Sequence, residues 1–312
     1  MRMVVEILAP GLVLEPWTGT ATKFEAANFT DPKGHSVRGF RAQLTASVRG
    51  GSSDRLRDRA VVVAQALLDL LLRWPLAEPQ ISVTVDGKPI RRTHDISRLQ
   101  TYEMGALLSG EPGLPRTQLS VGPQTPPRIE LLWLRAMGLP DAELDRLLGP
   151  LAQVSVGAAA QHPFDRVAPL WSAMELLYPR PRGDLARIDA IVSSDATLAA
   201  VETARGRPVL AGLLRFRGRL ASDPWLHEPV RRRLQSSSRS RADRVAMATV
   251  LAYAIRSEIV HGQWPRFRDD RRLEAGAAEG WLWQLVEREI EMRLAGQRLD
   301  VVRAVGAGTI SI

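Results

Sequence analysis

A dense run of glycine and proline residues divides this chain into two parts with different residue patterns. The run extends over residues 109–127 and contains Gly110, Pro112, Gly113, Pro115, Gly122, Pro123, Pro126 and Pro127. Both residue types disfavour the interiors of helices and strands, so such a run is typical of a connection between folded segments. A chain of 312 residues is long enough to form two domains. We therefore predict one domain over residues 1–125 and a second over residues 126–305, followed by a tail at 306–312.

The first part has a mixed pattern of strands and helices. Residues 3–8 are mainly apolar and predict a short strand, and residues 34–49 alternate in part, which suits one strand or a pair. A turn rich in glycine and serine then leads into residues 61–74, an apolar segment that predicts a helix. Residues 81–85 alternate cleanly, and the Asp86-Gly87 pair that follows is a turn signal able to open a hairpin.

The second part has helical patterns throughout. We predict helices over residues 129–137 and from Asp141 to about residue 160, because Asp141 can cap a helix. The next helix carries large side chains with the spacing of one buried stripe: Val167, Leu170, Trp171, Met174, Leu177 and Tyr178. Pro169 falls inside this stripe, so we expect the regular helix to start near Pro169 or to be kinked there.

The remaining chain also favours helices. Weaker helical patterns at residues 185–204 and 208–220 precede a Ser/Arg run that predicts a solvated loop. An apolar helix from about Asp243 to His261 and a final amphipathic helix at 280–294 follow. The overall prediction is an α+β protein, in which a mixed α/β domain precedes an all-α helical bundle.

The basic excess of the chain is concentrated in one segment. In total, 42 basic and 34 acidic residues give a formal net charge of +8, and residues 205–244 alone contain eleven arginines and three acidic residues. Concentrated arginine suits contact with a phosphate backbone, so we predict RNA binding by Arg231, Arg232, Arg233, Arg239 and Arg241. The alternative is a general preference for arginine over lysine along the whole chain, without functional meaning.

The sequence indicates neither an exported nor a membrane-spanning protein. Acidic, proline and glycine residues interrupt the first residues too early for the apolar region of a signal peptide. The longest apolar run, residues 61–72, contains Gln65 and Asp69 and is too short to cross a bilayer. The chain has no cysteine, which excludes disulfides and thiolate metal sites. We expect a cytoplasmic protein without a membrane partner.

The segment Arg256-Ser257-Glu258-Ile259-Val260-His261-Gly262 has residues suited to cutting RNA without a metal. Arginine is always charged and binds phosphate oxygens, and histidine can move a proton near neutral pH. Gly262 suits the end of a helix, so we expect His261 in the last turn, where the helix dipole favours its cationic form. The predicted reaction is attack of the ribose 2′-OH on the adjacent phosphorus. His261 would transfer the proton, and Arg256 would stabilise the charge on the phosphoryl oxygens.

Two further expectations follow from this segment and its surroundings. No group of side chains has metal-ligand spacing, so we predict neither a metal nor another cofactor. Five residues of ideal helix place Arg256 and His261 about 140° apart. That angle is poorly suited to one compact site on a single helix and better suited to a groove between two copies of it. We therefore expect a homodimer.

The same segment resembles the R-x4-H signature of HEPN-domain proteins, and in particular the RNxIVHG form of Apea-like HEPN domains. A second segment, Leu170-Trp171-Ser172-Ala173-Met174-Glu175-Leu176-Leu177, is similar to the LWxALE-L helix found upstream in that group. The resemblance covers residues 161–295. It implies a helical HEPN bundle that dimerises through the motif helices and often acts as a metal-independent endoribonuclease in defence or toxin systems, with a possible antitoxin or defence-system partner.

The resemblance also implies roles for individual residues. Arg256 and His261 match the catalytic pair, and Glu175 matches an acidic residue that supports the site, so we expect Glu175 to reach Arg256. Ser257 stands where the family often has asparagine, and its hydroxyl can still form a hydrogen bond, so we include it among the candidate catalytic residues. The shorter reach of serine favours a second interpretation, a non-catalytic HEPN module that binds RNA or a partner protein. A third is unrelated helical packing with chance motifs.

Overall fold

The computed structural model describes residues 1–10, 14, 16–30, 34, 36–48, 53–72, 80–90, 124–160, 162–179, 183–194, 197, 200, 206–224, 226–236, 240–261 and 269–295. Predictions that concern residues 91–123, Arg239, Gly262 and the tail at 306–312 lie outside these residues. Contacts group the chain into two compact units, Met1–Leu148 (unit 1) and Gly149–Ile312 (unit 2). The predicted α+β class is confirmed, because an antiparallel sheet near the N-terminus is followed by helices.

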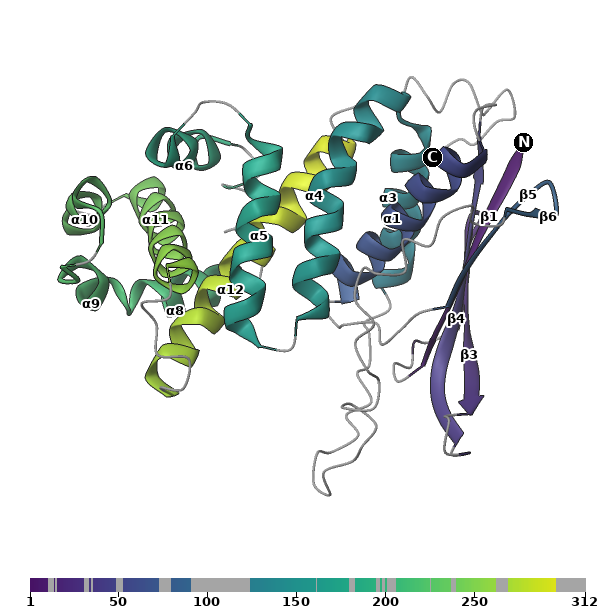
Figure 1. Cartoon of the computed structure of the whole chain (residues 1–312), viewed down its shortest axis with the longest axis horizontal. Helices are drawn as coiled ribbons and strands as arrows, with labels where there is room; N and C mark the ends of the chain where they lie inside the picture. Colours follow the sequence, from purple (N-terminus) through teal and green to yellow (C-terminus); the bar gives the residue numbers. More distant parts are fainter. Residues whose placement is uncertain are drawn as a thin grey trace. The chain divides into compact units, whose positions relative to one another are not determined.

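Unit 1 contains a six-stranded antiparallel sheet with the order β2-β3-β4-β1-β5-β6 (Figure 1). The predicted strands at 3–8 and 81–85 are confirmed as β1 and β5, and the segment 34–49 contains the single strand β4. The sequence patterns predict neither β2 nor β3. The strands are β1 (Arg2–Pro10), β2 (Trp17–Thr18), β3 (Thr22–Thr30), β4 (Ser36–Ser47), β5 (Gln80–Val85) and β6 (Lys88–Pro89).

The residue pattern of β3 explains why this strand is missed. Thr22 and Phe24 are buried, but Ala26, Asn28 and Thr30, which follow on the same side of the strand, are exposed. Alternation between buried apolar and exposed polar residues is the main signal of a half-buried strand. A strand that is buried only at its beginning therefore leaves too little of that signal in the sequence.

The central strands β1 and β4 supply the sheet part of the core. Every second residue of β1 is fully buried, and each stands opposite a buried residue of β4: Met3 opposite Ala46, Val5 opposite Leu44, Ile7 opposite Ala42 and Ala9 opposite Phe40. Period-two alternation thus directs one apolar face of the sheet toward the helices. The Asp86-Gly87 turn joins β5 to β6 with positive φ at both residues (49° and 77°), so the predicted hairpin is confirmed.

Two helices cover the apolar face of the sheet. Helix α1 (Ser53–Leu72) contacts β1 and β5, and α3 (Thr125–Gly138) contacts β3, β4 and α1. The buried carboxylate of Glu130 in α3 accepts hydrogen bonds from the backbone N–H of Thr20 (2.9 Å) and the hydroxyl of Thr22 (3.0 Å). The indole Nε1 of Trp133 donates to the carbonyl oxygen of Thr45 (2.8 Å). These contacts fasten α3 to the sheet.

The division of the chain by contacts differs from the predicted boundary at residue 125, which stays a prediction. The division falls between Leu148 and Gly149, inside α4 (Asp141–Ala159), because α3 and the first turns of α4 pack within unit 1. Arg59 of α1, whose side chain is buried, makes ion pairs with Asp141 (2.9 Å) and Asp145 (2.6 Å) of α4. A connection rich in glycine and proline marks a gap between elements, and packing decides which elements belong together.

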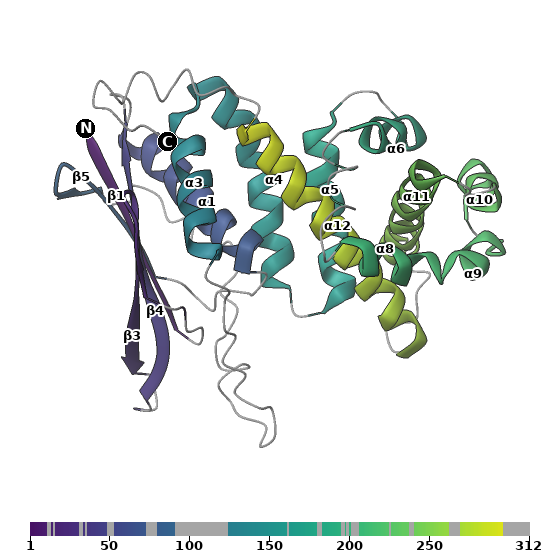
Figure 2. The ribbon, with the colours of Figure 1, turned by 180° about the vertical axis from the view of Figure 1, so that it is seen from behind.

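Unit 2 is helical and is arranged around α11 (Arg241–Val260). Within this unit α11 contacts each of the other helices after α4 whose bounds the structure describes. These helices are α5 (Pro163–Leu177), α6 (Asp184–Val192), α8 (Gly206–Leu214), α9 (Arg217–Ala221), α10 (Glu228–Gln235) and α12 (Asp269–Ala295). Figure 2 shows α11 in the same part of the ribbon as α8 and α10. Its central position explains why residues 250–255 are buried on every side.

Several predicted helices have different limits in the structure. Helix α5 begins at Pro163, a favourable first position, and continues through Pro169, so its regular part does not start near Pro169. The pattern at 185–204 corresponds to α6, which ends at Val192. Helix α12 begins at Asp269 rather than near residue 280, because its first turns bury the small residues Ala275 and Ala278 and so lack a stripe of large apolar side chains. Among the described helices, none has the length and apolar content needed to cross a membrane.

Candidate functional site

The candidate site lies at the C-terminal end of α11. The helix begins at a capping box, in which the Ser240 hydroxyl accepts from the Asp243 backbone N–H (3.0 Å) and the Asp243 carboxylate accepts from the Ser240 backbone N–H (2.8 Å). It ends at Val260, and His261 is the C-cap residue, with its backbone N–H donating to the Ser257 carbonyl (3.0 Å). The predicted helix is therefore confirmed, with His261 at its end.

The surroundings of α11 change abruptly at Arg256. Residues 250–255 are buried, whereas Arg256 and Ser257 are half-buried and Val260 and His261 are exposed. With about 100° of rotation per residue, these four side chains fall within one arc of about 140°. Ser257 and Val260 lie between Arg256 and His261 on that arc. We call the surface formed by Arg256, Ser257, Val260 and His261 the motif face.

The polar side chains of the motif face have no partners within the described part of the chain. Arg256, Ser257 and His261 form neither a side-chain hydrogen bond nor an ion pair with any described residue, and Arg256 Nε is buried without a hydrogen-bond partner. A buried donor without a partner costs free energy, so such a group needs an explanation. An arginine, a hydroxyl and an imidazole are therefore available together to bind an anion and to move a proton.

Glu175 does not make the predicted contact with Arg256. Its carboxylate accepts hydrogen bonds from Trp171 Nε1 (3.0 Å), one turn earlier on α5, and from Arg187 Nη1 (3.1 Å) on α6. Four residues of helix place Glu175 directly above Trp171, and a nearby arginine of α6 supplies the positive charge. Glu175 is therefore a partner of Arg187.

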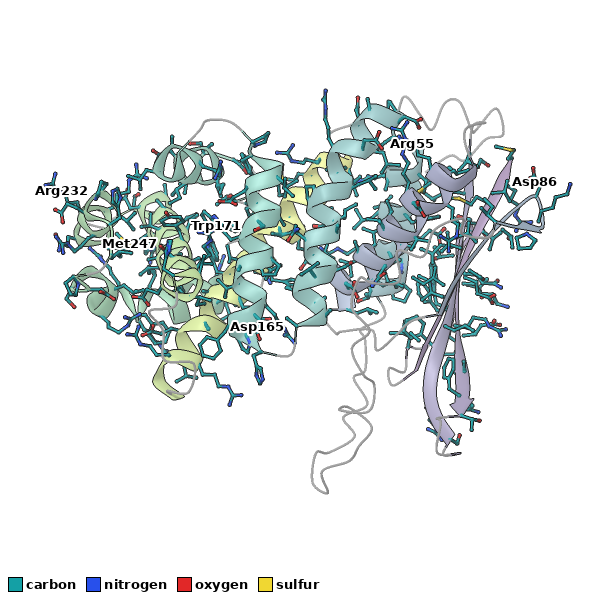
Figure 3. All side chains as sticks on the ribbon, viewed as in Figure 1. Arg55, Asp86, Asp165, Trp171, Arg232 and Met247 are labelled. Atoms are coloured by element: carbon teal, nitrogen blue, oxygen red, sulfur yellow. The ribbon has the colours of Figure 1, made fainter. Side chains whose placement is uncertain are left out.

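The two motif helices nevertheless pack together. Trp171 is fully buried, and its ring lies 5.2 Å from the ring of Tyr253 on α11. Figure 3 shows Trp171 on the side of α5 nearest to α11. Tyr253 lies one helical turn before Arg256. Glu175 can thus influence the motif face only indirectly, through the orientation of Trp171 and the packing of Tyr253.

Three of the five predicted RNA-binding residues, Arg231, Arg232 and Arg233, lie on the helix α10. Arg231 and Arg232 both pair with Glu228, the latter at 2.7 Å, and Arg233 pairs with Asp189 (2.5 Å). Hydrogen bonds from Arg232 and Arg231 hold the pKa of Glu228 below its ordinary value. The opposite face of α10 buries the apolar residues of the helix. The side chains of Arg239 and Arg241 lie outside the described residues.

Part of the basic character of α10 is not neutralised. Glu228 carries one negative charge and contacts two arginines, and the side chain of Arg232 is 76% exposed. Figure 3 shows Arg232 pointing away from the helices. A phosphate group could approach this residue without displacing a buried contact.

A cluster of charged residues lies behind the motif face and is absent from the sequence-based prediction. Glu258 is buried and accepts hydrogen bonds from both terminal nitrogens of Arg219 (3.3 Å each) and from Arg271 Nη1 (3.1 Å). Burial and a hydrogen bond with Asp223 raise the pKa of Glu258 to about 7, although the two arginines act in the opposite direction. One sequence signal could have indicated it, because Glu258 follows Ala254 by four residues and therefore lies on the apolar face of its helix.

Comparison with known proteins adds no relative to these observations. No family model, no curated protein and no solved structure matches the chain. Within the described residues, no three histidine, aspartate or glutamate side chains gather closely enough to hold a metal ion. The functional interpretation therefore rests on the residues of unit 2.

Proposed function

We propose that unit 2 is a HEPN-type endoribonuclease that cuts RNA at the motif face without a metal. The observation that carries this proposal is the unpartnered state of Arg256, Ser257 and His261 among the described residues, at the exposed end of an otherwise buried helix. Side chains that served only to stabilise the bundle would be expected to pair, as Glu175 and Glu258 do. The motif order seen in the sequence and the packing of α5 against α11 through Trp171 and Tyr253 support the same proposal.

The proposed reaction is an internal transfer of the phosphoryl group. His261 in its neutral form removes the proton from a ribose 2′-OH, the 2′-oxygen forms a bond to the adjacent phosphorus, and the bond to the 5′-oxygen of the next nucleotide breaks. That oxygen takes up a proton, leaving a 2′,3′-cyclic phosphate and a 5′-hydroxyl. Arg256 stabilises the negative charge that develops on the phosphoryl oxygens, and the Ser257 hydroxyl donates a hydrogen bond to one of them.

Binding of the substrate would use two surfaces. The exposed arginines of α10 would hold the RNA backbone, and the motif face would hold the phosphate that reacts. A homodimer in which two copies of α11 approach each other would bring two sets of Arg256 and His261 to one RNA strand. This proposal places the chain in the cytoplasm, and a defence-system or antitoxin partner would act by covering the motif face.

The proposal is tested with pure full-length protein and a mixture of single-stranded RNAs in EDTA. We expect cleavage by the native chain and loss of at least ~100-fold in rate for His261→Ala and Arg256→Ala, as is typical when a general acid–base or a charge-stabilising group is removed. Products should end in a cyclic phosphate. Arg244→Ala serves as a matched control, because Arg244 is exposed and lies more than three helical turns before Arg256 on α11. Equal cleavage by the native chain and His261→Ala would overturn the mechanism.

The second candidate function is a non-catalytic module that binds RNA or a partner protein. Ser257 favours it, because serine reaches less far than the asparagine common in the related signature. In that case the native chain would bind labelled RNA, with affinity lost in Arg232→Ala and Arg256→Ala, and would produce no cleavage in EDTA or in magnesium. One incubation with RNA therefore distinguishes the two candidate functions, because only the endoribonuclease yields cleaved RNA.

A further inference from the structure

Arg219 connects three helices of unit 2. It lies on α9, whereas Glu258 belongs to the last turn of α11 and Glu274 to the first turns of α12. The guanidinium of Arg219 donates from Nη1 and Nη2 to the two carboxylate oxygens of Glu258 (3.3 Å each) and from Nε to Glu274 (2.5 Å). A planar guanidinium with several donors can hold two carboxylates at once in one orientation. This arginine therefore fastens the end of α11 to both neighbouring helices.

The contacts of Arg219 are largely shielded from water. The side chains of Glu258 and Glu274 are only 5% and 4% exposed, and that of Arg219 is 30% exposed. Arg271 Nη1 donates to the same two carboxylates, at 3.1 Å to Glu258 and 3.4 Å to Glu274. Exposed ion pairs contribute little to stability, whereas removal of one partner of a buried pair is costly because the other charge stays buried. Removal of Arg219 should therefore disturb the end of α11 even though Arg271 remains.

Glu258 lies on the side of α11 away from the motif face. With about 100° of rotation per residue, it stands about 130° from the middle of the motif-face arc. Arg256 precedes Glu258 by two residues, and His261 follows it by three. All of these residues belong to the last turn or its cap, so a contact that holds one side of the turn also sets the direction of the other side.

The same contacts lead from the motif face to α10. Arg217, on the same helix as Arg219, donates from Nε to the carbonyl oxygen of Leu234 on α10 (2.6 Å). Helix α10 carries the exposed Arg232, to which the proposed function gives a role in holding the RNA backbone. Contacts from α10 to α9, and from Arg219 to Glu258, therefore join the two surfaces that would bind RNA.

We propose that Arg219 is a positioning residue that holds the motif face at a fixed place relative to α10. A phosphate at Arg232 and the phosphate that reacts would then keep one spacing along the RNA strand. Without Arg219 the last turn of α11 loses its contact with α9, and Arg256 and His261 meet the RNA in varying registers. The role in cleavage rests on the proposed function, whereas the fastening of α11 by Arg219 does not.

Hydrogen–deuterium exchange of the full chain tests the fastening. Arg219→Gln removes the charge and the fork of donors and keeps part of the side-chain volume. We expect the amide hydrogens of residues 257–261 to exchange about tenfold faster in this variant than in the native chain, while residues 245–252 keep the native rate. Glu279→Gln is the matched control, because it removes a partly buried ion pair with Arg166 (3.0 Å) that joins α5 to α12 instead. Native exchange at 257–261 in Arg219→Gln would overturn the inference.

A second variant covers the case in which Arg219→Gln does not fold. Arg219→Lys keeps the positive charge, but a lysine cannot hold two carboxylates with the fork geometry of arginine. We therefore expect residues 257–261 to exchange at least about twofold faster than in the native chain. Native exchange in a folded Arg219→Lys chain would equally overturn the inference.

A cleavage assay in EDTA with an end-labelled single-stranded RNA tests the positioning role. We expect Arg219→Gln to lower kcat about tenfold, to leave the Kd for RNA within about twofold, and to cut at additional neighbouring positions. A purely structural role would leave the cut positions unchanged at a temperature well below unfolding, as we expect for Glu279→Gln. Native kcat and native cut positions in Arg219→Gln would overturn the positioning role.

A double variant tests whether Arg219 acts through Glu258. Glu258→Gln should lower kcat as Arg219→Gln does, and the chain with both changes should be no slower than the slower single variant. Effects that multiply would contradict action through Glu258. Faster exchange in Arg219→Gln, with no RNA cleavage by the native chain, would support the fastening of α11 and overturn only the proposed function.

Discussion

Arg256 is the residue at which the needs of stability and of function conflict most directly. Its Nε is buried without a partner in the described part of the chain, so its guanidinium adds a desolvation cost that no described acid offsets. A positively charged group without a partner can bind an anion. In the proposed reaction, a phosphate group of the RNA would supply the hydrogen-bond acceptor that Arg256 Nε lacks. Glu258, two residues later, differs from Arg256 in that it already has partners, because two arginines contact it.

Replacing Arg256 by methionine should separate these two roles. Methionine keeps the apolar stem and removes the unpaired donor, so we expect the free energy of unfolding to stay within about 1 kcal/mol of the native value or to increase. Cleavage and RNA binding should both be lost. Urea denaturation followed by circular dichroism checks the first expectation. Destabilisation by more than about 2 kcal/mol would mean that Arg256 has a structural partner.

The partner of Glu175 can be identified with a double-mutant cycle. We expect Glu175→Gln and Arg187→Met to be coupled by about 0.5–1 kcal/mol in unfolding free energy, because the two side chains form a partly buried ion pair at 3.1 Å. Glu175→Gln and Arg256→Met should instead be additive to within about 0.5 kcal/mol. The same denaturation measurements supply both cycles. Coupling of Glu175 with Arg256 and not with Arg187 would contradict the observed pairing.

At the scale of elements, α11 combines a strong start with an exposed end. The capping box at Ser240 and Asp243 satisfies backbone donors of the first turn, and the described helices that contact α11 bury its middle. The last turn is held by the backbone hydrogen bond from His261 to Ser257 and by the contacts of Glu258. A rigid helix that delivers functional groups only at its end places them with little freedom to move.

Removal of the N-cap of α11 should lower the stability of the chain without changing the cleavage rate at the motif face. We expect Ser240→Ala to lower the unfolding free energy by about 1 kcal/mol, the usual cost of losing an N-cap. Ser222→Ala is a suitable comparison, because the Ser222 hydroxyl only donates to the carbonyl of Arg219 (2.8 Å) after a short helix. At a temperature well below unfolding, the cleavage rate of Ser240→Ala should equal the native rate. A greater loss in Ser222→Ala than in Ser240→Ala would contradict the capping role.

At the scale of the whole molecule, the chain consists of an α+β unit and a helical unit, and α3 determines where the first one ends. Four hydrogen bonds from residues 20–22 converge on Glu130, and Trp133 reaches the carbonyl of Thr45. Without α3, the apolar side of β4 would lose its cover. The helix therefore belongs to the sheet that it covers, although the glycine- and proline-rich connection separates them in sequence.

A pair of truncated chains tests this assignment. Residues 1–148 retain α3 and both aspartates that pair with Arg59, so we expect cooperative urea unfolding. Residues 1–125 lack the cover of the sheet and should unfold without a cooperative transition or aggregate through the exposed apolar face. Circular dichroism and size-exclusion chromatography distinguish these outcomes. Equal cooperativity of the two chains would favour the predicted boundary at residue 125.

Features that depend on neighbours in sequence could be predicted without the structure. Apolar content identified β1, and alternation identified β5. The Asp86-Gly87 pair identified the hairpin, and the spacing from Val167 to Leu177 identified the buried stripe of α5. The extent of α11 and the position of His261 at its end were equally accessible. In each case the signal is a local periodicity or a backbone preference. Such a signal depends only on residues a few positions apart in the sequence.

Features that depend on distant residues were decided only by tertiary structure. Glu130 meets Thr20 across 110 positions of sequence, and Glu258 meets Arg219 across 39. The sequence alone selected Arg256, Ser257 and His261 as candidates, but it paired Glu175 with Arg256 where the fold pairs it with Arg187. A charged side chain pairs with the opposite charge that the packing of helices brings within a few ångströms. The local residue pattern does not indicate which charge that is. The sequence by itself therefore determined most of the elements and the motif. The tertiary structure determined the remaining strands, the limits of several helices and the pairing of the described charged side chains.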